Sequence, residues 1–495
     1  MSKDLARRST VAVAWNMASG MSGMAVLFAR SIILARLLPV ETFGVYAGAS
    51  ALVVLTSVFA TFGMGGAFLH RALETEDEER AATVHFTLKL LFTTAWAAVL
   101  IAFALLRTTG EQQTALIVLT LATAGLEITQ TPRLILVRRV VHRRLALLSF
   151  VDSLLSTLVA VGLALMGATL WALLATDLEL MLVSIIGLYI WRPVWRPKFG
   201  WSRDVVRYYL NFGSRNFVSG ALLLALDRVD DLWTLRYLGD TALGFYSRAY
   251  TFATYPRRIL AGPVNQVAGG TYAELKSERK RLSQAFFRTN ALLVRSGFLM
   301  GGLLALIAPE LIAILLGDKW LPMLQAFRLM LVYTLLDPIK MTVADLFVAA
   351  GRPELVLRVR LAQLGVLLIG LFALGLRFGI AGVALAVDAM TVVGIVVLLH
   401  QARRYVDYSV RRLFLAPSLA LAAGLAAGWL AMALLGTVFA SSWWTALIKT
   451  ASFLLAYAAV LLLLERPLIR SLLSSVKGMR SRGQQAANAA DTKDV

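Results

Sequence analysis

The chain has 495 residues, of which 59% are hydrophobic and only 16% are charged. A soluble domain carries about 25% charged residues, so this composition excludes an ordinary soluble fold and indicates a surface that faces lipid. The net charge is +20, but the basic residues lie between apolar runs rather than in one basic segment, which argues against nucleic-acid binding. The chain has no cysteine, which excludes disulfides and thiolate sites, and its four histidines lack metal-ligand spacing, so we expect neither a metal nor a cofactor.

Long apolar runs follow one another along the whole chain. Each has about 20 or more mostly apolar residues, enough for a helix that crosses a membrane, and none shows the short alternating pattern of barrel strands. The predicted spans are 10–37, 42–69, 84–106, 114–137, 145–167, 170–191, 209–236, 242–270, 285–316, 322–349, 355–377, 380–402, 413–438 and 443–464. The first is too long for a signal peptide and is expected to be retained. We therefore predict an all-α polytopic membrane protein with about 14 transmembrane helices.

Lysine and arginine gather in alternate connections between these runs. Such residues collect on the cytoplasmic side of membrane proteins, and a cytoplasmic N-terminus places most of them there. The few basic residues in the outside connections are Arg36, Arg107, Arg236, Lys319 and Arg377. Because one missed helix would invert every later connection, the alternation supports an even number of helices and predicts that both termini are cytoplasmic.

Helices 1 and 2 resemble helices 7 and 8 at an offset of 200 residues. Trp-Asn-Met-Ala-Ser-Gly at 15–20 matches Arg-Asn-Phe-Val-Ser-Gly at 215–220. Identical pairs follow at the same offset: Arg36 and Arg236, Leu38 and Leu238, Gly44 and Gly244, Tyr46 and Tyr246, and Ala49 and Ala249. A repeat of six helices enters the membrane from the same side each time, so the two halves are related by an axis along the membrane normal. Transporters built in this way bind substrate between the halves and rock to alternate access.

The spans, the repeat and the linker composition predict five segments. They are a six-helix lobe over 1–192, a cytoplasmic linker over 193–208, a second six-helix lobe over 209–404, an extra transmembrane hairpin over 405–466, and a partly disordered cytoplasmic tail over 467–495. The linker contains two prolines, several charges and interfacial tryptophans, and the tail is rich in small and polar residues.

Several arginines lie within predicted spans, where charges are costly and usually line a pathway. The candidates for substrate binding are Arg30, Arg215, Arg248 and Arg295. A guanidinium group is always charged and matches phosphate with two parallel hydrogen bonds, so several of them around one cavity favour an anionic, phosphate-bearing substrate. The alternative is that these side chains extend to the cytoplasmic headgroups, which applies more to Arg215 and Arg295 than to Arg30 and Arg248.

Three carboxylates cluster in the seventh predicted helix. Asp227, Asp230 and Asp231 are spaced i, i+3 and i+4, which places them on one helix face. They can pair with Arg30 or Arg248, or bind a coupling Na⁺ or H⁺. Two other interpretations remain open, a structural ion-pair network between the halves and simple exposure at the outer surface.

Four segments in chain order resemble a known family. They are Ala-Arg-Leu-Leu-Pro-Val-Glu-Thr-Phe-Gly-Val-Tyr at 35–46, Arg-Tyr-Leu-Gly-Asp-Thr-Ala-Leu-Gly-Phe-Tyr-Ser-Arg-Ala-Tyr at 236–250, Leu-Leu-Gly-Asp-Lys-Trp-Leu-Pro at 315–322, and Ala-Ala-Gly-Arg-Pro-Glu-Leu at 349–355. Taken together they resemble the Wzx-type lipopolysaccharide and exopolysaccharide flippases of the multidrug/oligosaccharidyl-lipid/polysaccharide exporter superfamily. The resemblance covers helices 1–12.

The resemblance implies a two-lobed fold around a central cationic cavity in the bacterial cytoplasmic (inner) membrane. The substrate it implies is an undecaprenyl-pyrophosphate-linked oligosaccharide, flipped from the cytoplasmic to the outer leaflet, with a polysaccharide polymerase and assembly proteins as partners. Arg30 and Arg248 match positions where related flippases of lipid-linked cell-wall precursors carry cavity arginines. The acidic stretch that contains Asp227 and Arg228 departs from a uniformly basic cavity.

Two other functions compete with the flippase. A drug or organic-cation exporter of the same superfamily would need an acidic cavity, and the buried arginines argue against it. A polysaccharide polymerase or membrane glycosyltransferase would need an extracytoplasmic catalytic site, commonly on a long loop, and all the predicted outside connections are short. We therefore expect a transporter rather than an enzyme.

Overall fold

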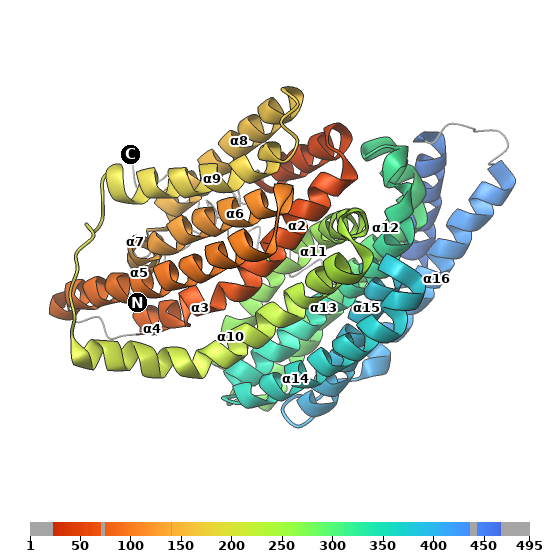
Figure 1. The fold of residues 1–495 in the computed structure, drawn as a ribbon. Helices are drawn as coiled ribbons and strands as arrows, with labels where there is room; N and C mark the ends of the chain where they lie inside the picture. Colours follow the sequence, from red (N-terminus) through yellow and green to blue (C-terminus); the bar gives the residue numbers. More distant parts are fainter. Residues whose placement is uncertain (1–22, 71–74, 140, 436–442, 467–495) are drawn as a thin grey trace, which may run out of the picture. The chain divides into compact units, whose positions relative to one another are not determined.

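A computed structural model of the chain describes residues 23–70, 75–139, 141–435 and 443–466 (Figure 1). The predicted tail and the first part of the first predicted span lie outside the described residues. Within the described residues the chain is helical and contains no strand. The first described helix covers residues 23–37.

The helices follow the predicted spans closely in order. In the N-terminal part they are α2 (Val40–Thr56), α3 (Val58–Thr61), α4 (Met64–His70), α5 (Thr75–Arg107), α6 (Gly110–Ile128), α7 (Gln130–Arg138), α8 (His142–Leu165), α9 (Trp171–Ile185) and the π-helical turn η1 (Ile186–Ile190). After the linker come α10 (Arg203–Leu238), α11 (Asp240–Leu275), α12 (Arg279–Leu315), the 3₁₀ turn η2 (Asp318–Met323), α13 (Leu324–Ala349), α14 (Pro353–Gly370), η3 (Leu371–Gly375), α15 (Leu376–Ala402) and α16 (Val410–Leu435). The last described helix is Trp443–Arg466.

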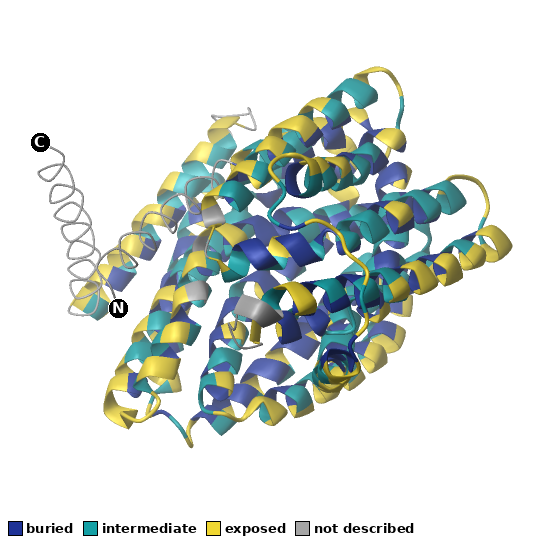
Figure 2. Ribbon diagram, turned by 90° about the vertical axis from the view of Figure 1, so that its left-hand side faces the viewer, coloured by how far each residue is buried: buried dark blue, intermediate teal, exposed yellow. Residues whose placement is uncertain are grey.

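Eight helical segments of the described chain are long and apolar enough to cross a membrane, and the pair α6–α7, bent by 41°, makes a ninth if it is counted as one span. Large apolar side chains are exposed along these helices, among them Leu106 (81%) and Trp429 (73%). Exposed residues follow the lengths of the helices in Figure 2, and a soluble monomer rarely shows so much apolar surface. The all-α polytopic membrane fold is therefore confirmed. The count of 14 helices stays a prediction.

The chain divides into two compact units. Unit 1 comprises Met1–Thr251, Leu315–Ala326 and Arg360–Met390, and unit 2 comprises Phe252–Ile314, Phe327–Val359 and Thr391–Val495. The chain passes from one unit to the other inside α11, at the end of α12, and inside α13, α14 and α15. The predicted division into two six-helix lobes and a hairpin remains a separate prediction.

Each unit has its own apolar core. In unit 1, α8 packs along α9, α5 along α6, and α10 along α2, and one cluster includes the buried Trp96 and Leu119. In unit 2, the largest cluster surrounds Phe286 and Phe347, and a smaller one joins Phe453 of the last helix to α12 and α16. These cores hold the polar side chains described below in fixed positions.

The starts of α2 and α11 approach each other closely in unit 1. A Cβ atom on Gly44 would lie 1.8 Å from the carbonyl oxygen of Asp240, and one on Gly244 would lie 2.3 Å from that of Val40. Only glycine allows so close a contact between backbones. Residues 40 and 240, like the two glycines, are separated by 200 positions, so the contact is reciprocal. Such reciprocity is what a local two-fold relation between the repeats predicts, and it supports the 200-residue repeat.

Candidate functional site

Arg248 of α11 is half-buried in unit 1 and lies against an aromatic ring. Its guanidinium carbon is 4.5 Å from the centre of the Phe43 ring of α2. The Phe43 ring in turn meets the fully buried Trp320 edge-on, with 5.5 Å between ring centres. A cation over an aromatic face is attracted electrostatically by the ring. This packing fixes the direction of the Arg248 side chain.

The turn η2 holds this arrangement in place at the end of helix 23–37. Trp320 Nε1 donates to the carbonyl of Ala35 at 2.8 Å, and Lys319 Nζ donates to the carbonyls of Arg36 and Leu38 at 3.0 and 2.8 Å. The last carbonyls of a helix have no partner within the helix, so these donors cap it. Burial lowers the pKa of Lys319, an effect that the nearby charge of Glu41 opposes. The motif at 315–322 therefore anchors the helix that carries Arg30.

Arg30 is half-buried in helix 23–37 and forms no hydrogen bond or ion pair with any residue that the structure describes. Its charge nevertheless acts on three carboxyl groups, those of Asp152 in α8 and of Asp177 and Glu179 in α9. Tyr46 donates to Asp177 at 2.8 Å. The buried Glu179 carboxyl group lies against that of Asp152, with which it shares a side-chain hydrogen bond. Arg30 is thus a guanidinium with acidic neighbours and no fixed partner.

The three aspartates of α10 have separate surroundings in unit 1. Asp230 and Asp231 are buried, whereas Asp227 is exposed. Tyr246 of α11 donates to Asp230 at 2.5 Å, and Asp231 forms an ion pair with Arg228 at 3.3 Å on the same helix. Both carboxylates therefore have partners on α10 and α11. Among the described residues, no group of three or more His, Asp or Glu side chains is arranged to hold a metal ion.

Arg215 and Arg295 lie in different surroundings from the first two arginines. Arg215 is an exposed residue of α10 in unit 1. Arg295 of α12, in unit 2, is buried and binds Glu465 of the last helix through two nitrogens, at 2.5 and 2.7 Å. It also donates to the carbonyl of Ala291 at 2.8 Å. The structure thus brings Arg30, Arg248 and the aspartates into one unit and places Arg295 in the other.

The sequence analysis did not single out Lys89 as a charge inside the membrane. Lys89 of α5 is buried, forms an ion pair with Glu127 of α6, and donates to the carbonyl of Ala60 at 3.3 Å. It lies only five residues inside the predicted span 84–106, close enough to its end to look like an interfacial charge. The signal that could have identified it was Glu127 in the next span, which needs a cationic partner there. The carboxyl groups of Asp152, Asp177 and Glu179 were visible within predicted spans, but their grouping around Arg30 depends on tertiary packing.

Comparisons with known proteins agree on the class of molecule. Residues 33–325 match the model of a family described as polysaccharide biosynthesis protein. The chain is 30% identical over 331 residues to the succinoglycan biosynthesis transport protein ExoT of Rhizobium meliloti (strain 1021), with 64% of each chain covered. It is 24% identical over 181 residues to the teichuronic acid biosynthesis protein TuaB of Bacillus subtilis (strain 168), covering 36% of this chain and 37% of that relative. The chain thus matches less than two thirds of the length of either relative.

Solved structures with the same fold cover most of the chain. The lipid II flippase MurJ in an inward closed conformation aligns with a TM-score of 0.75 at 15% identity, over 92% of this chain and 99% of that one. An inward-facing multidrug resistance transporter of the MATE family, from the MOP superfamily, aligns with a TM-score of 0.58 at 16% identity, over 77% and 94%. At these identities the likeness establishes the fold and leaves the substrate open.

Proposed function

Because the chain belongs to the polysaccharide biosynthesis protein family, we propose that it is a flippase that moves a lipid-linked oligosaccharide across the bacterial cytoplasmic membrane. The substrate in this proposal is an undecaprenyl-pyrophosphate-linked oligosaccharide, carried from the cytoplasmic to the outer leaflet for lipopolysaccharide or exopolysaccharide synthesis. The family match and a relative named as a succinoglycan transport protein support a transporter rather than an enzyme. The distribution of basic residues between the predicted spans supports cytoplasmic termini.

The observation that carries the proposal is Arg30. A half-buried guanidinium without an ion pair in a membrane protein is costly unless a ligand or water cavity offsets its desolvation. Arg30 is such a group within the described chain, and Arg248 presents a second guanidinium, oriented by Phe43, in the same unit. A pyrophosphate offers the oxygens that guanidinium groups bind with two parallel hydrogen bonds. We assign both arginines to pyrophosphate binding.

The remaining predicted site residues receive different assignments in this proposal. Arg215 is exposed and is assigned to attracting the anionic headgroup before it enters. Asp230 and Asp231, with Asp227 beside them, are assigned to coupling with H⁺ or Na⁺ during alternating access. For Arg295 the contacts with Glu465 favour a structural contribution over substrate binding.

Export by variant proteins tests the assignment of the arginines. We expect Arg30→Ala and Arg248→Ala to trap lipid-linked oligosaccharide on the cytoplasmic leaflet while the protein level stays normal. The matched control is Arg107→Ala, which removes an exposed arginine at the end of α5. The measurement is the fraction of lipid-linked oligosaccharide that an impermeant glycan-oxidising reagent reaches from outside intact spheroplasts. Wild-type exposure in both variants would remove these arginines from the mechanism.

A cation exporter of the same superfamily is the second candidate, because the MATE transporter shares the fold. It predicts that a deletion strain becomes sensitive to cationic dyes while its outer-leaflet oligosaccharide is unchanged. The flippase proposal predicts that dye sensitivity is unchanged in the deletion strain and that its outer-leaflet oligosaccharide is lost. Partner polymerases and assembly proteins belong to the flippase proposal and are tested by co-purification with the intact chain.

A further inference from the structure

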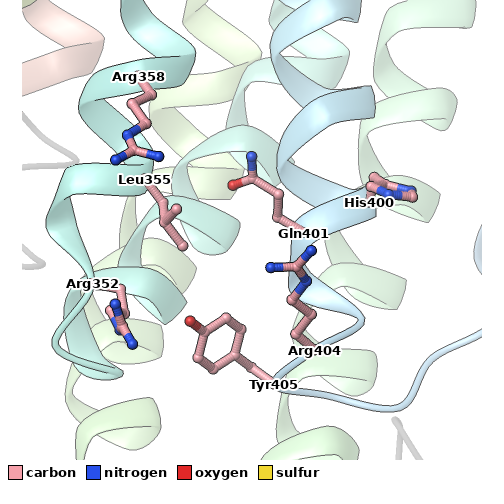
Figure 3. A pocket seen from close by; sticks show the side chains of 7 residues that line it. All are labelled: Arg352, Leu355, Arg358, His400, Gln401, Arg404 and Tyr405. Atoms are coloured by element: carbon pink, nitrogen blue, oxygen red, sulfur yellow. The ribbon is translucent and has the colours of Figure 1, made fainter.

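A basic pocket of about 350 Å³ lies in unit 2, away from Arg30 and Arg248 in the sequence. It forms where α14 begins and α15 ends. One side carries Arg352, Leu355 and Arg358, and the other carries Gln401, Arg404 and Tyr405. In Figure 3 the labelled side chains of the two sides surround a common open space, whereas His400 lies farther away on the right. Three guanidinium groups thus surround one concavity.

The arginines of this pocket differ from other arginines of unit 2 in how many have a carboxylate partner. Arg279 is paired with Asp407 at 2.8 Å and Arg281 with Glu278 at 2.9 Å. Arg358 and Arg404, in contrast, have no hydrogen bond or ion pair from their side chains to any residue that the structure describes. Cytoplasmic ends of membrane helices are generally basic, but three arginines around one pocket, two of them beside the Glu354 carboxylate, leave an excess of positive charge that favours a bound anion.

Arg352 and Gln401 refine the chemistry of that anion. Arg352 has a carboxylate partner, since it reaches Glu354 at 3.3 Å, but that pair is widely exposed and easily exchanged. The side-chain oxygen of Gln401 is buried and lacks a hydrogen-bond donor among the described residues. A buried carbonyl oxygen without a donor costs free energy. A phosphate ester that also carries a hydroxyl group would satisfy both features, with phosphate on the arginines and the hydroxyl on Gln401.

The pocket rests on a rigid base. Val356, Val359 and Ala402, which are neighbours of the lining residues, are buried in the main core of unit 2. The ring of Tyr405 meets the buried Phe347 edge-on with 5.6 Å between ring centres. Side chains held by a packed base lose less conformational freedom when a ligand binds, which favours binding.

We propose that this pocket binds a hydroxyl-bearing phosphate ester, as found in the headgroup of a glycerol-phosphate lipid or in a soluble glycerol phosphate. In the orientation adopted under the proposed function, the pocket opens at the cytoplasmic headgroup level, where basic pockets between helices bind anionic lipids. None of its lining residues is one of the arginines assigned to pyrophosphate binding, so its occupancy is measured without any export.

Binding to the purified full-length protein tests the proposal. The probes are nanodiscs of phosphatidylcholine with and without phosphatidylglycerol, and soluble glycerol 1-phosphate. The test variant is Arg358→Gln/Arg404→Gln. The control is Arg279→Gln/Arg281→Gln, which removes the same number of charges from paired arginines. The readouts are the amount of phosphatidylglycerol that remains bound in native mass spectrometry and the midpoint of thermal unfolding in phosphatidylcholine alone, which reports whether each variant is folded.

We expect phosphatidylglycerol to bind the wild type and the control, and to bind the test variant about 30-fold more weakly, from the loss of two cationic contacts. If glycerol 1-phosphate displaces the lipid at equal concentration, the ligand is the soluble ester, and this result supports the proposed binding site. Equal binding by the folded test variant and the wild type, equal loss in the control, or binding of neither probe to the wild type would overturn the proposal. For a test variant that does not fold, Gln401→Leu replaces it and is expected to weaken binding of the hydroxyl-bearing ester about tenfold.

Discussion

The two units of this protein differ in whether their buried charges have ion-pair partners. In unit 2, Arg295 is satisfied by Glu465, Lys449 is satisfied by Glu310 at 2.5 Å, and Asp337 accepts from both Arg257 and Lys340 at 2.7 and 2.6 Å. In unit 1, Arg30 has no ion pair with a described residue, and Glu179 lies against a second carboxyl group, that of Asp152. Paired charges in unit 2 connect helices to one another, whereas the proposed function assigns Arg30 of unit 1 to the substrate.

Unit 1 also contains a buried ion pair of the kind found in unit 2. Lys89 and Glu127 join α5 to α6 much as Arg295 and Glu465 join α12 to the last helix. The difference between the units is therefore specific to the helices around Arg30 and does not apply to all charges of unit 1. Pairing, rather than burial alone, separates a structural charge in the membrane from a functional one.

Breaking the pair of Arg295 should give the largest loss of stability. Arg295→Met leaves Glu465 largely buried and uncompensated, which costs about 3–5 kcal/mol in the free energy of unfolding. Arg295→Met/Glu465→Leu removes both charges and should recover most of this loss. The measurement is thermal unfolding of the purified variants in one detergent. If the double variant is as unstable as the single one, the pair is not what joins the last helix to α12.

Adding a methyl group at Gly44 should be the next largest change. The new Cβ would lie 1.8 Å from the carbonyl oxygen of Asp240, so the starts of α2 and α11 must separate, at a cost of about 1–3 kcal/mol. Gly162→Ala is the matched control, because nothing lies within 4 Å of a Cβ atom at that position in α8. Melting in detergent compares the two variants. Equal midpoints would contradict the close approach of the two helices.

Replacing Glu179 by Gln should change function more than stability. Glu179 shares its hydrogen bond with another carboxyl group, that of Asp152, and an amide at this position keeps a hydrogen-bonding group there, so the free energy of unfolding should fall by less than about 1 kcal/mol. Because the negative charge near Arg30 is removed, export should change while the protein level stays normal. The same spheroplast assay measures export. A strong loss of stability with unchanged export would place Glu179 among the structural charges instead.

The exposed pair Arg279–Asp407 should show the smallest effect. Arg279 lowers the pKa of Asp407, so the pair contributes only above the ordinary pKa of aspartate, about 3.9, and is lost as the pH falls through the lowered value. Arg279→Gln should leave the melting midpoint at pH 7 and the export rate close to wild type, because exposed pairs are screened by solvent. A large drop in the midpoint at pH 7 alone would contradict this ranking.

Much of the fold could be predicted from the sequence, because lipid requires long apolar helices and glycine reports close backbone contacts. The matching glycines at 44 and 244 followed from the 200-residue offset, and the structure places them in reciprocal contact. The partners of the charges could not be predicted in the same way. The residues that pair with Arg295 and that surround Arg30 lie more than 100 positions away in the chain, so only tertiary packing distinguishes a paired arginine from an available one.

The central claim is that Arg30 of unit 1, which has no ion pair with a described residue, serves transport, while the paired Arg295 of unit 2 serves structure. Its most direct test compares Arg30→Ala with Arg295→Met/Glu465→Leu in the spheroplast assay at equal protein levels. We predict that Arg30→Ala lowers the externally accessible lipid-linked oligosaccharide at least tenfold, as expected for the loss of a charged hydrogen bond to phosphate, and that the double variant keeps wild-type exposure. Wild-type exposure in Arg30→Ala, together with loss of exposure in the folded double variant, would contradict the claim.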